Sequence, residues 1–171
     1  MSTAFLRESD LEEKPVQVKR VSPLPPGAKN LMTLGGRERL RQELTRLVET
    51  ERPKLAAGKD EAKPQLDALD DQIRYLQQSL QSAEVVEPPP PGEERARVRF
   101  GALVSLRDKK GVIARYRLVG VDETDMDQGR ISYISPLARV LTNAKVGQKV
   151  ELKTRTGPNQ LEVTAIDYPS D

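Results

Sequence analysis

Two acidic residues, Asp60 and Glu61, lie in a short polar stretch between two helical patterns. Their side chains are the first candidates for a catalytic or metal-binding role. Carboxylate oxygens are hard ligands that suit Mg²⁺. The chain has no histidine and no cysteine, which excludes serine–histidine and cysteine–histidine catalysis and cysteine metal sites. Any catalysis would have to use carboxylates, lysine, tyrosine or an active site supplied by a partner. Alternatively, the two acids simply cap and solvate the helix that follows them.

A second group of acids runs from Asp122 to Asp127 and resembles part of a calcium-binding loop. An EF-hand loop beginning at Asp125 would need a glutamate at position 136, and that position is Pro136. We therefore predict a solvent-exposed loop for this segment rather than a metal site.

The composition restricts the classes of protein. The 171 residues include 32% charged residues with a net charge of only +2, and aromatic residues make up 4%. Binding nucleic acid through charge alone would need a local basic cluster, and base-stacking platforms are not expected. The sequence contains no run of eighteen apolar residues and no recognisable signal peptide, which favours a cytoplasmic protein without a membrane span.

The elements that position these groups follow from the spacing of apolar residues. Residues 1–30 are rich in proline and poor in apolar residues, which predicts a flexible extension. Residues 33–57 and 64–83 are predicted helices, with Thr33 as the N-cap of the first and with Pro53 kinking or breaking it. Their short connection makes them antiparallel neighbours, so we expect a monomer with an intramolecular coiled-coil hairpin rather than a coiled-coil dimer. The residues of the predicted seam are Leu40, Leu44, Leu47, Leu66, Leu69, Ile73, Leu76 and Leu80.

A proline run at 88–91 divides the hairpin (31–86) from a β domain (96–171), and we predict that the linker 87–95 is a stiff spacer. Within the second part, two pairs of β patterns flank glycine-containing turns, which predicts two hairpins. The predicted strands are 98–106, 111–120, 130–135, 145–154 and 159–168. Residues 136–143 are a predicted short helix with Ser135 as its N-cap. The predicted fold class is α+β, a helical hairpin followed by an antiparallel β domain.

Short motifs along the chain, in this order, resemble those of the Gre family of bacterial transcription factors. A leucine-rich helix runs into Arg52-Pro53, and the sequence 82–86 (SAEVV) resembles the family's exit from the second helix. The most specific match is Ile131-Ser132 followed by the segment 135–139 (SPLAR), which contains Ser135, Pro136, Leu137, Ala138 and Arg139. The extension at 24–30 is similar to GreB-like rather than GreA-like members.

This resemblance implies an FKBP-like β domain that grips the rim of the RNA polymerase secondary channel through the 135–139 segment. It also implies a coiled coil that enters the channel and carries acidic residues to the catalytic Mg²⁺ of the polymerase, where they stimulate cleavage of backtracked RNA. The metal would be the polymerase's own ion, so we expect no cofactor and no enzyme activity in this chain alone. Nucleic acid would be contacted only within the polymerase complex.

The chain departs from the family at the end of the hairpin. The Gly-Asp…Glu-Asn motif of the cleaving members is absent, and the hairpin is shorter by about one heptad per helix, or about 10 Å of reach. We therefore predict a polymerase-binding modulator with weak or no stimulation of cleavage. The alternatives are an active cleavage factor using Asp60 and Glu61, a prolyl isomerase suggested by the FKBP-like fold, and a coiled-coil adaptor that does not act on polymerase.

Overall fold

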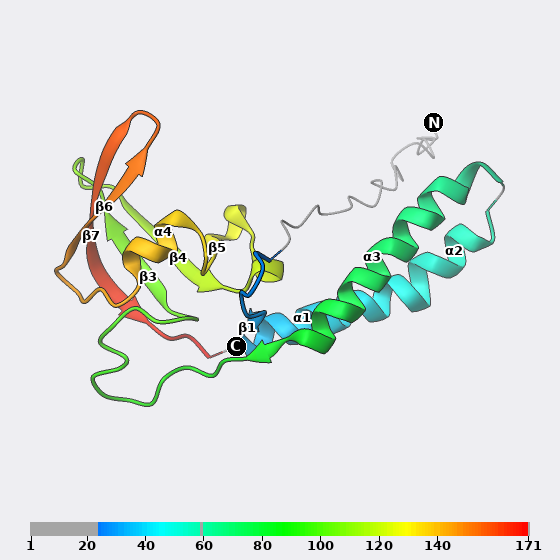
Figure 1. Cartoon of the computed structure of the whole chain (residues 1–171), viewed down its shortest axis with the longest axis horizontal. Helices are drawn as coiled ribbons and strands as arrows, with labels where there is room; N and C mark the ends of the chain where they lie inside the picture. The colour runs from blue at the N-terminus through cyan, green and yellow to red at the C-terminus, as the bar shows by residue number, and fades with distance from the viewer. Residues whose placement is uncertain (1–23, 59, 171) are drawn as a thin grey trace, which may run out of the picture.

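The computed structural model describes residues 24–58 and 60–170, which form a long helical arm at one end and a β domain at the other (Figure 1). The chain is α+β, as predicted. Most of the predicted extension, residues 1–23, lies outside the described residues. The adjoining residues 24–30 lead into the strand β1 (Leu31–Met32), and the buried side chain of Asn30 donates to the Ser79 carbonyl at 3.0 Å and to Ser82 Oγ at 3.0 Å.

The first half of the arm is a continuous helical segment. Thr33 is the N-cap of α1 (Leu34–Arg46), as predicted, because its hydroxyl accepts from the Gly36 amide at 2.9 Å. A π-helical turn, Leu47–Glu51, then leads into α2 (Arg52–Ala56). Pro53 does not break the helix. The turn before it is widened instead, and the Arg52 amide donates to Leu47 five residues earlier.

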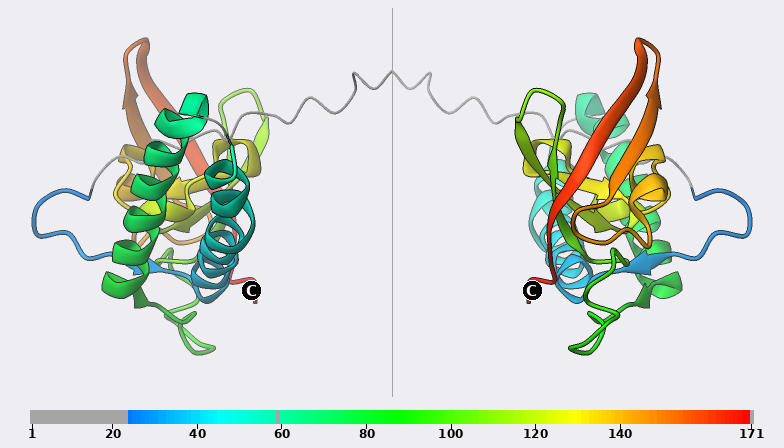
Figure 2. Two further views of the ribbon diagram at one scale, coloured as in Figure 1. Left: turned by 90° about the vertical axis from the view of Figure 1, so that its right-hand side faces the viewer. Right: turned by 90° about the vertical axis from the view of Figure 1, so that its left-hand side faces the viewer.

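The second half of the arm runs back beside the first (Figure 2). A 3₁₀ turn, Asp60–Ala62, opens α3 (Lys63–Ser82), a helix of 20 residues and about 30 Å. The strand β2 (Glu84–Val85) then pairs in parallel with β1 and closes the base of the arm. Arg52 of α2 forms a two-pronged ion pair with Asp70 of α3, at 2.7 and 3.2 Å, which ties the two halves together near the tip.

Most of the predicted seam residues form the core of the arm. The buried cluster is Met32, Leu40, Leu47, Leu69, Ile73 and Leu76, with Leu44, Leu55, Leu80 and Ala83 packed against it. Leu66, the remaining member of the predicted seam, is half-buried and lies outside this cluster. The sequence pattern missed Met32, which is fully buried at the base.

The β domain is a five-stranded sheet in the order β5-β4-β3-β7-β6. Its strands are β3 (Leu103–Arg107), β4 (Ile113–Val119), β5 (Arg130–Ser132), β6 (Lys149–Thr154) and β7 (Gly157–Asp167). Both predicted hairpins are present, as β3–β4 and β6–β7. The sheet is mixed rather than antiparallel, because β5 pairs with β4 in parallel. The connection between β4 and β5 crosses over instead of turning back, which the short run 130–135 did not reveal.

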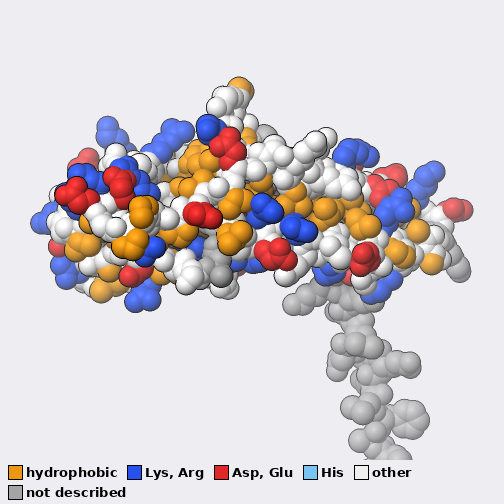
Figure 3. All heavy atoms as spheres, turned by 90° about the horizontal axis from the view of Figure 1, so that it is seen from below, with side chains coloured by type: hydrophobic (Ala, Val, Ile, Leu, Met, Phe, Trp, Pro, Cys, Tyr) orange, Lys and Arg blue, Asp and Glu red, His pale blue; other side chains and the backbone are white. Residues whose placement is uncertain are grey.

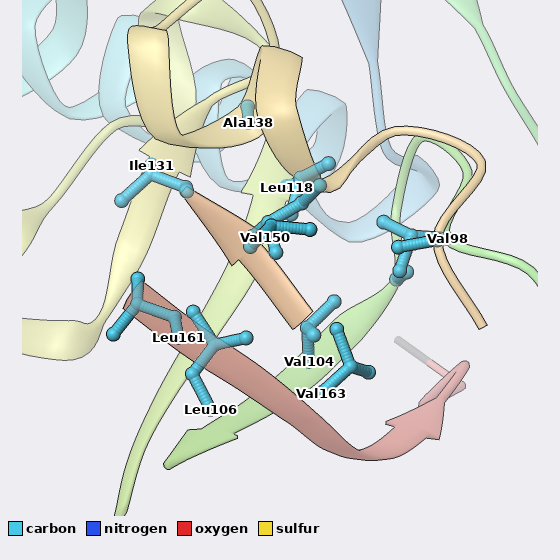
Figure 4. Close-up of a cluster of buried hydrophobic side chains, with 12 residues drawn as sticks. Val98, Val104, Leu106, Leu118, Ile131, Ala138, Val150, Leu161 and Val163 are labelled. Atoms are coloured by element: carbon cyan, nitrogen blue, oxygen red, sulfur yellow. The ribbon is translucent and has the colours of Figure 1, made fainter. Parts of the chain in front are cut away.

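The core of the β domain lies between the sheet and the short helix α4 (Pro136–Leu141) (Figure 4). Val104 and Leu106 of β3, Leu118 of β4 and Val163 of β7 are almost fully buried there. Each apolar side chain of this size contributes about 1.5–3 kcal/mol by leaving water, so α4 is held in place by the core beneath it.

The linker between arm and β domain does not run straight. The proline run is followed by turns at residues 91–96, where Gly92 has a φ of 135°. Arg95 Nε donates back to the Pro89 carbonyl at 2.7 Å. The stiffness of the linker stays a prediction. The turns begin where the proline run ends, because four prolines restrain their own stretch but not the glycine that follows them. In the described part of the chain, no helix combines the length and apolar character needed to cross a bilayer.

Candidate functional site

The tip of the arm carries the two acids singled out from the sequence. Asp60 and Glu61 are both exposed and open the 3₁₀ turn before α3. The N-cap of α3 is Ala62 and has no side-chain hydrogen bond, so the expected capping role of Asp60 was wrong. Among residues 24–58 and 60–170, no three acidic side chains come together as a potential metal site. In the described part of the tip, these two carboxylates have no third acidic side chain close enough to complete a metal site.

The 135–139 segment lies on the β domain, at the opposite end of the molecule from the tip (Figure 1). Ser135 caps α4, as predicted, because its Oγ accepts from the Ala138 amide at 3.2 Å. Ala138 is fully buried in the core and Leu137 packs against the same core from a partly buried position. Pro136 and Arg139 are exposed. Of the five predicted docking residues, these two present a free surface, while Ser135 and Ala138 hold the helix in place.

Charges of both signs are interspersed with hydrophobic side chains on the face of the molecule shown in Figure 3. On α1, Arg46 contacts Glu43 at 2.8 Å and Glu51 at 3.0 Å. Arg39, also on α1, approaches Glu123 of the β domain at 3.6 Å. These two arginines of α1 are thus paired with acidic side chains of the same molecule.

The junction of arm and β domain contains a buried carboxylate that sequence reasoning missed. Glu123 belongs to a 3₁₀ turn, Val121–Glu123, and its side chain is fully buried. One of its oxygens accepts from the amides of Thr33 at 3.0 Å and of Gly120 at 2.8 Å, and the other accepts from the Thr33 hydroxyl at 2.5 Å. The prediction of an exposed loop was wrong for this residue. Its carboxylate lies at the start of α1, where a helix favours negative charge.

Asp122, next to Glu123, contacts the other helix of the arm. Its carboxylate accepts from the Tyr75 hydroxyl at 2.5 Å and from the Ser79 hydroxyl, both on α3. Burial raises the pKa of Tyr75 well above its usual value, and the bond to Asp122 raises it further. A separate bond joins Tyr133, which follows β5, to the Lys29 carbonyl at 2.5 Å. The junction therefore has three points of attachment.

A signal for this junction is present in the sequence. Gly35 and Gly36 lie two and three residues after the N-cap Thr33, in the first turn of α1, where glycine is unfavourable for a helix. Such a pair indicates close approach of another group. In the structure, a Cβ at Gly36 would lie 1.6 Å from Glu123 Oε1. The glycine therefore makes room for the carboxylate.

Comparisons with known proteins show which family this chain belongs to. Residues 93–168 match the family described as "Transcription elongation factor, GreA/GreB, C-term". The transcription elongation factor GreB of Neisseria meningitidis serogroup B is 36% identical over 155 residues, which cover 82% of this chain and 94% of that protein. GreA of Verminephrobacter eiseniae is 34% identical over 155 residues, covering 80% of this chain and 96% of that protein. The structure of a GreA/GreB elongation factor from Nitrosomonas europaea is 22% identical, with a TM-score of 0.40, covering 82% of this chain and 100% of that one. The chain belongs to the GreA/GreB family of transcription elongation factors.

Proposed function

We propose that this protein binds RNA polymerase at the secondary channel and modulates elongation with weak or no stimulation of transcript cleavage. In this proposal the β domain, taken as FKBP-like, docks on the channel rim, and the arm, taken as a coiled coil, points inward. The protein would act as a monomer in the cytoplasm and would have no catalytic activity of its own. Pro136 and Arg139 support the docking role because they are the exposed residues of the 135–139 segment.

The observation that carries the proposal is that the arm is short and ends in only two exposed acids in its described part. The arm ends with two exposed acids on a short 3₁₀ turn, and the helix behind them is about 30 Å long. A Mg²⁺ ion needs its oxygen ligands at about 2.1 Å. An arm that is one heptad too short holds its carboxylates about 10 Å from such an ion. A modulator that occupies the channel without supplying metal ligands fits these dimensions.

Cleavage of RNA in stalled elongation complexes tests the proposal. Wild type and the double variant Asp60→Ala/Glu61→Ala are compared with a cleaving GreB as the positive control. We expect slow cleavage with both chains, and slower GreB-stimulated cleavage when either chain is added in excess. Vigorous cleavage that is lost in the double variant would establish an active cleavage factor instead.

Binding is measured separately by pull-down with purified core polymerase. We expect retention of wild type, and loss of retention when an excess of GreB competes for the channel. A chain that folds but is not retained by the core enzyme would favour an adaptor that acts elsewhere.

A further inference from the structure

The arm and the β domain are joined covalently only through the linker 87–95 and the residues that flank it, up to the bridge at Arg97. This segment bends at Gly92 and contains no helix or strand before the isolated bridge at Arg97. Such a connection limits how far the arm can separate from the β domain but does not set the direction in which it points. The direction must come from non-covalent contacts at the junction.

We propose that Asp122 and Glu123 form a latch that fixes the direction of the arm relative to the β domain. The latch is defined as these two acids together with the arm groups they contact, which are Thr33, Arg39, Tyr75 and Ser79. The two acids are positioning residues, because their side chains bond to the arm and to their own turn. The inference rests on the proposed function for its purpose, since a fixed direction matters only if the arm must enter a channel.

The first part of the latch, the set of bonds made by Glu123, favours one orientation of the arm. Glu123 is buried, so each of its oxygens needs a donor, and a buried carboxylate left without donors is strongly unfavourable. One donor, the Gly120 amide, lies beside its own turn, while the amide and hydroxyl of Thr33 come from the arm. The guanidinium of Arg39, also on the arm, lies 3.6 Å from the same carboxylate and opposes its charge. A small tilt of the arm would break these bonds while the carboxylate is still buried away from water. Intermediate orientations are therefore disfavoured.

The second part of the latch, the bonds made by Asp122, prevents the arm from rotating about its attachment at Glu123. A single attachment at the start of α1 would allow the arm to swivel about that point. Asp122 makes its bonds to α3 through Tyr75 and Ser79, which are one helical turn apart and share a face. Two attachments on two different helices define a direction. The bond from Tyr133 to the Lys29 carbonyl adds a third point beside them.

Two glycines, one on each side of the junction, allow this close approach. Gly36 leaves the space that the Glu123 carboxylate enters, and a Cβ there would overlap it. On the other side, a Cβ at Gly120 would lie 2.0 Å from the Leu31 carbonyl oxygen. The backbones of the two parts are therefore in direct contact at the latch, which a flexible hinge would not require.

The length of the arm amplifies any error in direction. A tilt of about 20° at the base would move the tip of a roughly 30 Å arm by about 10 Å. That displacement is comparable to the length by which this arm is shorter than that of the cleaving members, about one heptad in each helix. A short arm that must reach into a channel thus depends on its latch as much as on its length.

Pulsed electron–electron double resonance, which measures the distance between two spin labels, tests the latch on the full chain without polymerase. The chain has no cysteine, so Gln65→Cys on the arm and Lys149→Cys on the β domain give one defined pair of nitroxide labels. We expect a narrow distance distribution in this background. Adding Glu123→Ala should broaden the distribution and shift its mean, whereas Asp127→Asn, an exposed acid in the next turn, should leave it unchanged.

A second pair, Lys109→Cys and Lys149→Cys, lies within the β domain and should give the same distribution in every variant. If Glu123→Ala fails to fold by circular dichroism, Tyr75→Phe/Ser79→Ala replaces it, because it removes the two donors to Asp122 from the arm side. An unchanged distribution in the folded latch variant would overturn the proposal. That outcome is independent of polymerase binding, so a failure of the latch and a failure of the proposed function are told apart.

Discussion

The amide and the hydroxyl of Thr33 both donate to the carboxylate of Glu123, a residue 90 positions later in the chain. The same hydroxyl accepts from the Gly36 amide and caps α1. The start of the arm and its attachment to the β domain are therefore one hydrogen-bond network. A change at any of these three residues should affect helix capping and domain orientation together.

Gly36→Ala should have opposite effects in two backgrounds. In wild type the new Cβ overlaps the Glu123 carboxylate, and we expect a loss of about 1–3 kcal/mol in the free energy of unfolding, typical of overpacking. In a Glu123→Ala background the space is empty, and alanine should stabilise the helix by up to about 1 kcal/mol. Urea unfolding of the four proteins measures this cycle. Equal losses in both backgrounds would mean that Gly36 is needed for some reason other than the carboxylate.

The arm was the part of the fold most accessible from the sequence. Leu69, Ile73 and Leu76 follow a helical period, and that period alone placed them in a buried seam. The Thr33 and Ser135 caps were also predictable, because the chemistry of capping is local. The parallel pairing of β5 with β4 depends on a crossover of the chain, and no local pattern encodes it.

The candidate site divides in the same way. Asp60 and Glu61 were placed at the tip correctly, because a turn between two helical patterns is visible in the sequence. Glu123 was misassigned to an exposed loop, because its donors come from a distant segment and an acid in a polar run resembles surface. Ala138 was grouped with docking residues although it is fully buried, since a motif match does not distinguish a contact residue from the packing residue beside it.

Alkaline titration should report the state of the latch. The pKa of Tyr75 is raised in the folded protein, first by burial and then by Asp122, so the folded state holds this proton more tightly than the unfolded state. The resulting stability is fully present below the ordinary pKa of 10.0 and is lost as the pH rises through the folded value. We expect Asp122→Asn to lower the pKa of Tyr75 but to leave it above 10.0, because burial remains.

Difference ultraviolet titration against Tyr75→Phe isolates this residue from the other three tyrosines. Tyr133 and Tyr168 also have raised pKa values, again mainly through burial, and they serve as internal references that Asp122→Asn should not move. An unaltered Tyr75 titration in Asp122→Asn would show that the bond between the two residues does not persist in solution.

Ser135 and Arg139 should separate folding from docking. Ser135→Ala removes the N-cap of α4 and should lower the free energy of unfolding by about 1 kcal/mol. Arg139→Glu changes an exposed residue and should change stability by less than about 0.5 kcal/mol, while weakening retention by core polymerase. Thermal unfolding and pull-down measure the two effects, with Lys149→Glu on β6 as the matched control of reversed charge. Equal weakening by the control would indicate a non-specific charge effect.

Asp60→Ala/Glu61→Ala should lower the stability of the arm slightly at low salt and leave it nearly unchanged at high salt. Neither acid caps α3, and their exposed charges near a helix start are each worth about 0.3–1 kcal/mol at low salt and less in physiological salt. Circular dichroism during urea unfolding, at low and at high salt, measures the change. A loss that persists at high salt would mean that the acids support the tip through hydrogen bonds. A loss that disappears at high salt would mean that the two carboxylates affect stability through their charge alone. An effect of the double variant on stalled polymerase would then have to come from direct contact of these side chains with the complex.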